Sequence, residues 1–223
     1  MKNIQITTPD SLELSKMFHE IKNPLTLINS SLQLIESDHP EVKEFRFWNQ
    51  TMSDLASLRK LINELSSYQK GSLLNISKID LFDFTEDLLE STAGFLLETG
   101  TPLTLDCDIL DLDFYADVIK LRQAVVNLLK NAAESSPAGS PINLSITTDS
   151  ERLFITVKDK GCGISNADRK RVFEPFHTTK SYGTGLGIPI VKRIVNAHGG
   201  VLSIYSEEGV GTTVQIILPL SPL

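Results

Sequence analysis

The sequence predicts an α+β fold in which an N-terminal antiparallel helical hairpin is followed by a two-layer α/β sandwich with a mixed sheet. Two features of the pattern predict it. Up to about residue 70, apolar residues recur at steps of three and four, as in packed helices. Later segments alternate strand-like runs with helical ones. The helical pattern gives way to the mixed one at a break formed by Gly71 and Ser72. We therefore expect two domains, 1–72 and 73–223.

Two long amphipathic segments predict the hairpin. Asp10 or Ser11 can cap the first helix, and Asp10 with Glu13 has the spacing of a capping box. Its apolar seam consists of Leu14, Phe18, Ile21, Leu25, Ile28, Leu32 and Ile35. The turn-forming run 37–41 ends this helix, and a second helix is expected over about 42–68. Its inward side chains would be Phe45, Trp48, Met52, Leu55, Leu58, Ile62 and Leu65.

A single hairpin cannot cover both of its seams. Burial of apolar surface is worth roughly 25 cal/mol per Å², so a second copy of the chain is the obvious cover for what remains. The sequence therefore predicts a homodimer whose two hairpins form a four-helix bundle.

The rest of the chain alternates strand and helix signals. Asp80 and Asp117 precede helical patterns, where a carboxylate can cap the helix N-terminus. Helices are expected over about 81–98, 117–134 and 186–197, with a short one near 167–173. Strands are expected at 75–79, 103–109, 112–115, 142–148, 153–159, 201–206 and 212–218. Several helices with a substantially antiparallel sheet favour the two-layer sandwich.

Composition narrows the classes of function. The chain has 21 basic and 28 acidic residues and a net charge of −7, which argues against broad binding to nucleic acid or to anionic membranes. Its two cysteines, Cys107 and Cys162, lack metal-ligand spacing. No run of about 18 apolar residues occurs. We expect a cytoplasmic chain or the cytoplasmic part of a membrane-associated protein, with any further domain upstream or on another protein.

The string HEIKNP, which begins at His19, carries the first residues suited to chemistry. The seam includes Phe18 and Ile21, so His19 should face solvent, with Asn23 one turn further along the same face. A neutral imidazole is nucleophilic at cytosolic pH, and Glu20 beside it can take the proton from the other ring nitrogen. Taken alone, an ordinary exposed histidine is the commoner explanation.

Two segments suit the magnesium ion and the base of a nucleotide. Asn127 and Asn131 lie one helical turn apart, and an amide oxygen can hold Mg²⁺ without repelling phosphates. Asp159 ends a strand and can accept a hydrogen bond from the exocyclic amine of adenine. Gly161 and Gly163 let the backbone approach the base. Each pattern alone is weak, because polar surface residues and ordinary turns look the same.

A third segment suits phosphates. Gly183, Gly185, Leu186 and Gly187 stand directly before a helix, and amides at a helix N-terminus favour phosphate. Lys180, shortly before them, can reach phosphate oxygens. The glycine spacing could also indicate a dinucleotide fold, but no parallel βαβ unit with an acidic residue about 20 positions on is evident. The GK[ST] ending of a P-loop is absent as well.

Six segments occur in the order of the H, N, G1, F, G2 and G3 boxes of sensor histidine kinases: HEIKNPL, NLLKNAAE, DKGCGI, FEPFHTTK, GTGLGI and GVGTT. Together they closely resemble that family over nearly the whole chain. The resemblance implies a dimerisation and histidine-phosphotransfer hairpin followed by a GHKL-type, Bergerat-like ATP-binding domain. By position it makes His19 the phosphorylated residue, Glu20 its base and Asn131 the Mg²⁺ ligand.

The resemblance also makes Asp159 the adenine contact and places Lys180, Gly185 and Gly187 around the phosphates. It implies an ATP- and Mg²⁺-dependent autokinase that donates the phosphoryl group to an aspartate of a response-regulator receiver domain. An Asn at position 23 adds the hypothesis that the chain also dephosphorylates that partner.

Two rivals belong to other classes. A non-catalytic dimeric interaction module with a vestigial nucleotide site would be separated by a nucleotide-binding assay. A GHKL ATPase that drives conformational change would have no need of a reactive histidine on a dimer helix.

Overall fold

The structure, a computed structural model, describes residues 11–109, 113–180 and 183–220, with side chains from residue 16 onward. The expected cap at Asp10, the seam position Leu14 and the first residue of the strand expected at 112–115 lie outside this description. The chain divides into two compact units, Met1–Lys70 and Gly71–Leu223. No helix among the described residues is long and apolar enough to cross a membrane.

The N-terminal unit is a helical hairpin. Helices α1 (Ser11–Asp38) and α2 (Trp48–Lys70) pack together and are joined by the short 3₁₀ helix η1 (Pro40–Glu44). The prediction that the second helix begins near residue 42 is wrong. Pro40 starts the tighter 3₁₀ turn, and the backbone becomes extended at Phe45 (ψ 131°), so the α-helical pattern restarts only at Trp48.

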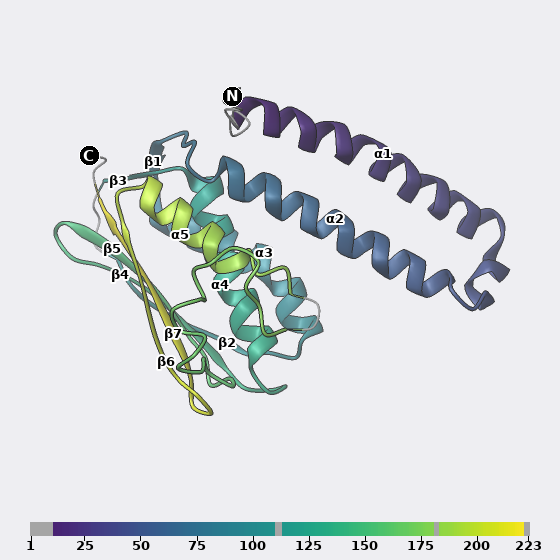
Figure 1. The fold of residues 1–223 in the computed structure, drawn as a ribbon. Helices are drawn as coiled ribbons and strands as arrows, with labels where there is room; N and C mark the ends of the chain where they lie inside the picture. The colour runs from purple at the N-terminus through teal and green to yellow at the C-terminus, as the bar shows by residue number, and fades with distance from the viewer. Residues whose placement is uncertain (1–10, 110–112, 181–182, 221–223) are drawn as a thin grey trace, which may run out of the picture. The chain divides into compact units, whose positions relative to one another are not determined.

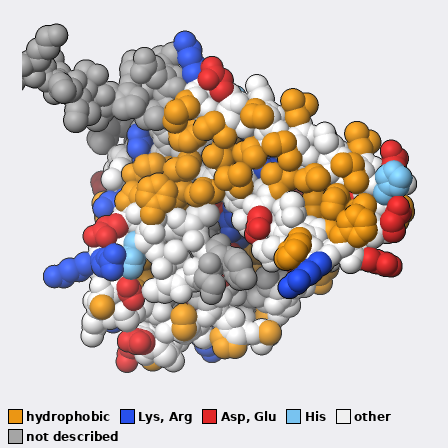
Figure 2. Space-filling model, turned by 45° about the vertical axis from the view of Figure 1, so that its right-hand side comes forward, with side chains coloured by type: hydrophobic (Ala, Val, Ile, Leu, Met, Phe, Trp, Pro, Cys, Tyr) orange, Lys and Arg blue, Asp and Glu red, His pale blue; other side chains and the backbone are white. Residues whose placement is uncertain are grey.

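The hairpin covers only part of its apolar surface. Its buried residues are Val42, Leu55 and Ile62. Half-buried seam residues are Phe18, Leu25, Leu32, Trp48, Met52 and Leu65. A second set of large apolar side chains stays exposed: Met17, Ile21, Leu27, Ile28, Leu34, Ile35, Phe45, Phe47 and Leu58. Figure 2 shows hydrophobic side chains gathered in a band along the hairpin. We call this exposed set the uncovered apolar face.

The C-terminal unit has two layers (Figure 1). Five strands form one sheet in the order β2-β4-β5-β7-β6. They are β2 (Leu103–Asp108), β4 (Ile142–Thr148), β5 (Arg152–Lys158), β6 (Val201–Glu207) and β7 (Gly211–Pro219). Strand β2 pairs with β4 in parallel and every other pairing is antiparallel, so the prediction of a mixed sheet is confirmed. A separate antiparallel pair joins β1 (Ser77–Ile79) to β3 (Phe114–Ala116).

Helices α3 (Leu81–Glu98), α4 (Val118–Ser135) and α5 (Gly187–Ala197) cover one face of the sheet (Figure 1). The core lies between these helices and alternate residues of the strands, such as Leu153 and Ile155 of β5, which are both fully buried. The expected caps are present. Asp80 accepts hydrogen bonds from two amides of the first turn of α3, and Asp117 accepts one from the amide of Lys120 at 3.0 Å.

Residues 166–173 form successive turns instead of the expected short helix. The amides of Asp168 and Arg169 both donate to the carbonyl of Ser165, and those of Arg171 and Val172 both donate to the carbonyl of Asp168. The bonds therefore restart at Asp168 instead of continuing as a helical ladder. Ser165 and Asp168 also bond through their side chains, and such local bonds compete with helix formation.

Candidate active site

His19 lies exposed on α1, as do Glu20 and Asn23. Its ring nitrogen Nε2 lies 3.5 Å from Nζ of Lys70, at the end of α2. An ammonium group can only donate hydrogen bonds, so this contact favours the tautomer in which Nε2 keeps its lone pair and Nδ1 carries the proton. Nε2 is then the nucleophilic nitrogen. The sequence contains no local signal for Lys70, because it is 51 residues from His19.

Asp159 directly follows β5 and is 7% exposed. Its Oδ1 accepts hydrogen bonds from the amide of Gly161 at 2.8 Å and from that of Thr212 at 3.1 Å. Burial raises the pKa of Asp159 above its ordinary range, while these two bonds and the charge of Lys180 act in the opposite direction. Among the described residues no donor bonds to Oδ2. That oxygen can therefore accept a hydrogen bond from a ligand.

The turn after Asp159 is pressed between two backbone segments. A side chain at Gly161 would collide with the carbonyl of Ser135, at the end of α4, and one at Gly163 would collide with the carbonyl of Glu207. Gly163 also has a φ of 69°, which disfavours any other residue. The amide of Cys162 donates to the carbonyl of Ser135 at 3.0 Å. This turn is thereby fixed beside the C-terminal end of the helix that carries Asn131.

The N-terminus of α5 meets α4 at Asn131. A Cβ atom at Gly187 would lie 3.2 Å from Nδ2 of Asn131, so the absence of a side chain lets the first turn of α5 approach that amide. Leu186, which is fully buried, precedes the helix, and no side chain caps its first amides. Uncapped amides at a helix N-terminus can bind an anion. Asn127 is half-buried on α4, one turn before Asn131.

Lys180 lies at the same end of α4. Its Nζ is 2.7 Å from a carboxylate oxygen of Glu134 and 3.5 Å from the carbonyl oxygen of Asn131. Gly183 packs against Thr178 and against Cβ of Lys180. The ammonium group expected at the phosphates is thus held by a carboxylate. Sequence reasoning did not single out Glu134, because nothing local pairs it with a lysine 46 residues away.

The geometry brings Asn131, Asp159, Gly161, Lys180 and Gly187 together and leaves His19, Glu20 and Asn23 on the helical unit. No cluster of three or more His, Cys, Asp or Glu suited to a metal occurs in the described part of the chain. The side-chain oxygen of Asn131 could hold a magnesium ion together with the oxygens of a phosphate ligand.

The sequence and the fold of this chain are similar to those of known proteins. The family model of the histidine kinase-, DNA gyrase B-, and HSP90-like ATPases matches residues 116–222. Sporulation kinase C of Bacillus subtilis (strain 168) is 31% identical over 208 residues, which are 91% of this chain and 47% of that protein. The chain spans less than half the length of this relative and of two other curated relatives that it matches.

Two solved structures share the fold. Full-length ShkA in complex with AMPPNP has a TM-score of 0.81 at 22% identity, over 96% of this chain and 47% of that one. The histidine kinase ThkA in complex with the response regulator protein TrrA has a TM-score of 0.67 at 23% identity, over 94% of this chain and 61% of that one. The solved structures show the shared fold, and the ATPase family match with the relative aligned along most of the chain shows that this chain belongs to the sensor histidine kinase family.

Proposed function

We propose that the chain is the catalytic core of a sensor histidine kinase. It binds ATP with Mg²⁺, phosphorylates its own His19, and passes the phosphoryl group to an aspartate of a response-regulator receiver domain. One observation carries the proposal: a buried acceptor (Asp159), an amide ligand (Asn131), an uncapped helix N-terminus (Gly187) and an ammonium group (Lys180) converge in one unit. These four groups suit the base, the metal ion and the phosphates of a magnesium-bound adenine nucleotide.

In this proposal each end of the site recognises a different part of ATP. Oδ2 of Asp159 accepts the exocyclic amine of adenine, and the tight turn of Gly161 and Gly163 lies along the base. The amides at Gly187 and the ammonium of Lys180 bind phosphate oxygens. Asn131 holds Mg²⁺ through its side-chain oxygen, and the ion neutralises charge on the triphosphate when it is bound.

The transfer step forms a bond between Nε2 of His19 and the γ-phosphorus. It breaks the bond between that phosphorus and the oxygen bridging to the β-phosphate, so ADP leaves with the electron pair. Glu20 takes the proton from Nδ1 as positive charge develops on the ring. The contact with Lys70 supports Nε2 as the attacking atom, because it selects the tautomer with the lone pair on that nitrogen; the contact itself must open before the attack.

The uncovered apolar face supports the homodimer. Nine large apolar side chains of the hairpin are exposed in the single chain, with Leu27 at 69% and Leu34 at 64%. A second hairpin would bury them and complete a four-helix bundle. We therefore assign dimerisation and phosphotransfer to residues 1–72 and ATP binding to residues 73–223. Leu27→Asp should convert the dimer to a monomer in light scattering, whereas Gln33→Asp, on an exposed polar position of the same helix, should not.

A receiver domain is the proposed acceptor. The structurally similar ThkA was solved with a response regulator protein, and an exposed His19 is open to a second protein. Asn23, exposed one turn after His19, can orient a water molecule towards a phosphorylated partner. We propose dephosphorylation of the partner as a second activity. Asn23→Ala should slow decay of the phosphorylated partner and leave labelling of His19 intact.

The kinase is tested with γ-labelled ATP and Mg²⁺. The chain should take up acid-labile label, His19→Gln should abolish the label, and His39→Gln should retain it, because His39 is also exposed on the hairpin but at its far end. Asn131→Ala should bind little Mg-ATP and take up no label, with an unchanged unfolding midpoint. ATP binding without any label would favour the non-catalytic module, and normal label in His19→Gln would refute the assigned acceptor.

A further inference from the structure

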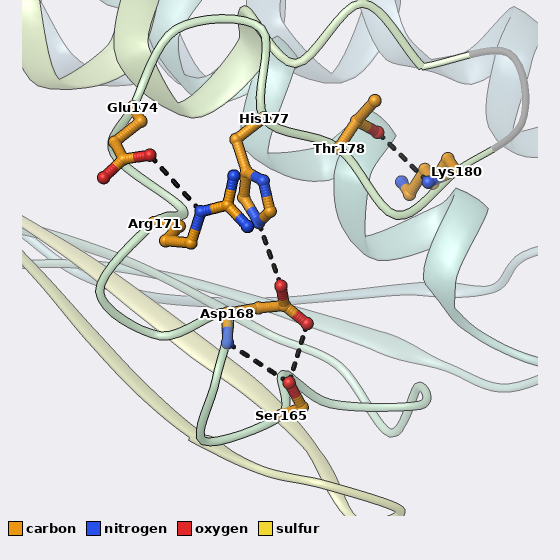
Figure 3. Close-up of polar contacts among 7 residues, drawn as sticks. All are labelled: Ser165, Asp168, Arg171, Glu174, His177, Thr178 and Lys180. Carbon is orange, nitrogen blue, oxygen red and sulfur yellow. Dashed lines mark hydrogen bonds and ion pairs between the residues drawn. The ribbon is translucent and has the colours of Figure 1, made fainter.

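Three side chains outside the nucleotide contacts form a network in the segment before Lys180 (Figure 3). Nε2 of His177 lies 3.0 Å from Oδ1 of Asp168, and the hydroxyl of Ser165 donates to Oδ2 of Asp168 at 2.7 Å. The amide of Asp168 returns a bond to the same hydroxyl at 3.2 Å. Both carboxylate oxygens of Asp168 are therefore engaged, so its position is tightly defined.

This network is partly shielded from water and includes a charged group. The side chain of His177 is only 13% exposed and that of Asp168 is 27% exposed. The hydrogen bond from Ser165 and the interaction with His177 hold the pKa of Asp168 below its ordinary range, so the carboxylate is ionised at neutral pH. A neighbouring pair, Arg171 with Glu174, is longer at 3.4 Å and more than half exposed at both ends. The two pairs in one segment thus differ in how strongly they constrain the chain.

The backbone of His177 is in direct contact with the glycine turn before α5. A Cβ atom at Gly185 would lie 2.7 Å from both the amide nitrogen and the carbonyl oxygen of His177. The amide of Phe176 donates to the carbonyl of Gly185 at 3.1 Å. Phe176 has a φ of 66° and is the one non-glycine residue with positive φ among those described. Such a conformation persists only where its surroundings hold it.

We infer that Asp168 and His177 form a positioning clamp for phosphate binding. The Asp168 carboxylate, fixed by Ser165, anchors the side chain of His177, and the backbone at His177 holds Gly185 so that the first amides of α5 face the phosphates. Both residues act through the glycine turn and do not touch the nucleotide. The inference rests on the proposed ATP site and deepens it by naming what positions its phosphate end.

The test measures two affinities of the full chain by calorimetric titration, one for ATP with Mg²⁺ and one for adenosine. The ratio between them reports phosphate recognition alone, because adenosine uses only the base end at Asp159. His177→Leu should lower this ratio about fivefold, the scale of one ion pair, and leave adenosine binding unchanged. His177→Gln, whose amide still donates to Asp168, should recover most of the ratio. Glu174→Gln, in the neighbouring exposed pair, is the matched control and should change nothing.

Coupling between the two clamp residues is the second measurement. Asp168→Ala should lower the ratio as His177→Leu does, and the double variant should be no worse than either single variant. Additive losses, an unchanged ratio in His177→Leu, or equal losses of ATP and adenosine affinity would each overturn the clamp. If the unaltered chain binds ATP no more tightly than adenosine, the proposed function fails, and the clamp fails with it.

Discussion

Asp159→Asn should change which base the site prefers without disturbing the turn around it. Both backbone donors to this side chain, the amides of Gly161 and Thr212, bond to the single oxygen Oδ1. Only the oxygen of an asparagine amide can accept them, so it must take the place of Oδ1. The NH₂ group then stands where Oδ2 was, and a hydrogen-bond acceptor has become a donor.

The expected size of the effect follows from that exchange. ATP loses a hydrogen bond between its exocyclic amine and a charged acceptor, which is worth about 2 kcal/mol or about 30-fold in affinity. Inosine triphosphate has a carbonyl oxygen in place of that amine. It should bind the Asp159→Asn variant more tightly than it binds the original chain, because an oxygen acceptor now meets a donor.

The same substitution should stabilise the fold. Burial raises the pKa of Asp159 above its ordinary value of 3.8, so the folded chain holds this proton more tightly than the unfolded chain does. The ionised carboxylate therefore lowers the free energy of unfolding at neutral pH, and this penalty is lost as pH falls through the raised pKa towards 3.8. Asp159→Asn should be more stable than the original chain at pH 7, and the difference should shrink at lower pH.

Calorimetric titration of both chains with ATP and inosine triphosphate gives four affinities, and urea unfolding at about pH 7 and about pH 5 gives the stabilities. The reasoning predicts a reversal of base preference in a variant that is at least as stable. A variant that binds ATP as tightly as the original chain would show that Oδ2 does not meet the base. A variant that loses both nucleotides and unfolds more readily would show that the turn depends on the negative charge.

Three further contacts can be tested by substitution. Glu134→Gln should bind ATP several-fold more tightly in titration, because it releases Lys180 for phosphate, and its affinity for adenosine should not change. Lys180→Met should bind ATP more weakly. Weaker ATP binding by Glu134→Gln would contradict the idea that Lys180 leaves Glu134 for phosphate. Gly163→Ala should lower the free energy of unfolding by about 2 kcal/mol or more, because its side chain would collide with the backbone of Glu207. Gly94→Ala, in open space on a helix, is the control and should raise the free energy of unfolding by about 0.5–1 kcal/mol. Equal unfolding midpoints for the two variants would refute the predicted collision at Gly163. Lys70→Met should slow labelling of the acceptor histidine about fivefold without weakening ATP binding, and an unchanged labelling rate would remove its assigned influence.

Residues that act through local chemistry were predictable from the sequence. The caps at Asp80 and Asp117 depend only on a carboxylate standing before a helical pattern, and both form. Alternating apolar residues predicted β4, β5 and β7, since one face of each is buried. Two predictions of helix were wrong where another local pattern competes. After Pro40 a 3₁₀ helix forms in place of the first α-helical turn, and after Ser165 side-chain hydrogen bonds replace helical ones.

Contacts that depend on the tertiary fold could not be predicted in this way. Glu134 meets Lys180 across 46 residues and Lys70 meets His19 across 51, so only the packed structure pairs them. The parallel pairing of β2 with β4 is likewise a matter of strand order, which periodicity does not encode. The sequence therefore indicated the residue types needed for ATP, and the structure supplied the groups that hold them.

The two ends of the candidate site are built by different means. The base end is fixed by the sheet: the amide of Asp159 donates to the carbonyl of Thr212 at 2.9 Å, and the amide of Thr212 donates to Oδ1 of Asp159. The phosphate end depends on side-chain ion pairs, Lys180 with Glu134 and Asp168 with His177. The pair of Lys180 with Glu134 is partly exposed, so it contributes little stability and Lys180 can exchange the carboxylate for a phosphate. The sheet should therefore set which base is bound, while the phosphate end can rearrange on phosphoryl transfer with the base still in place.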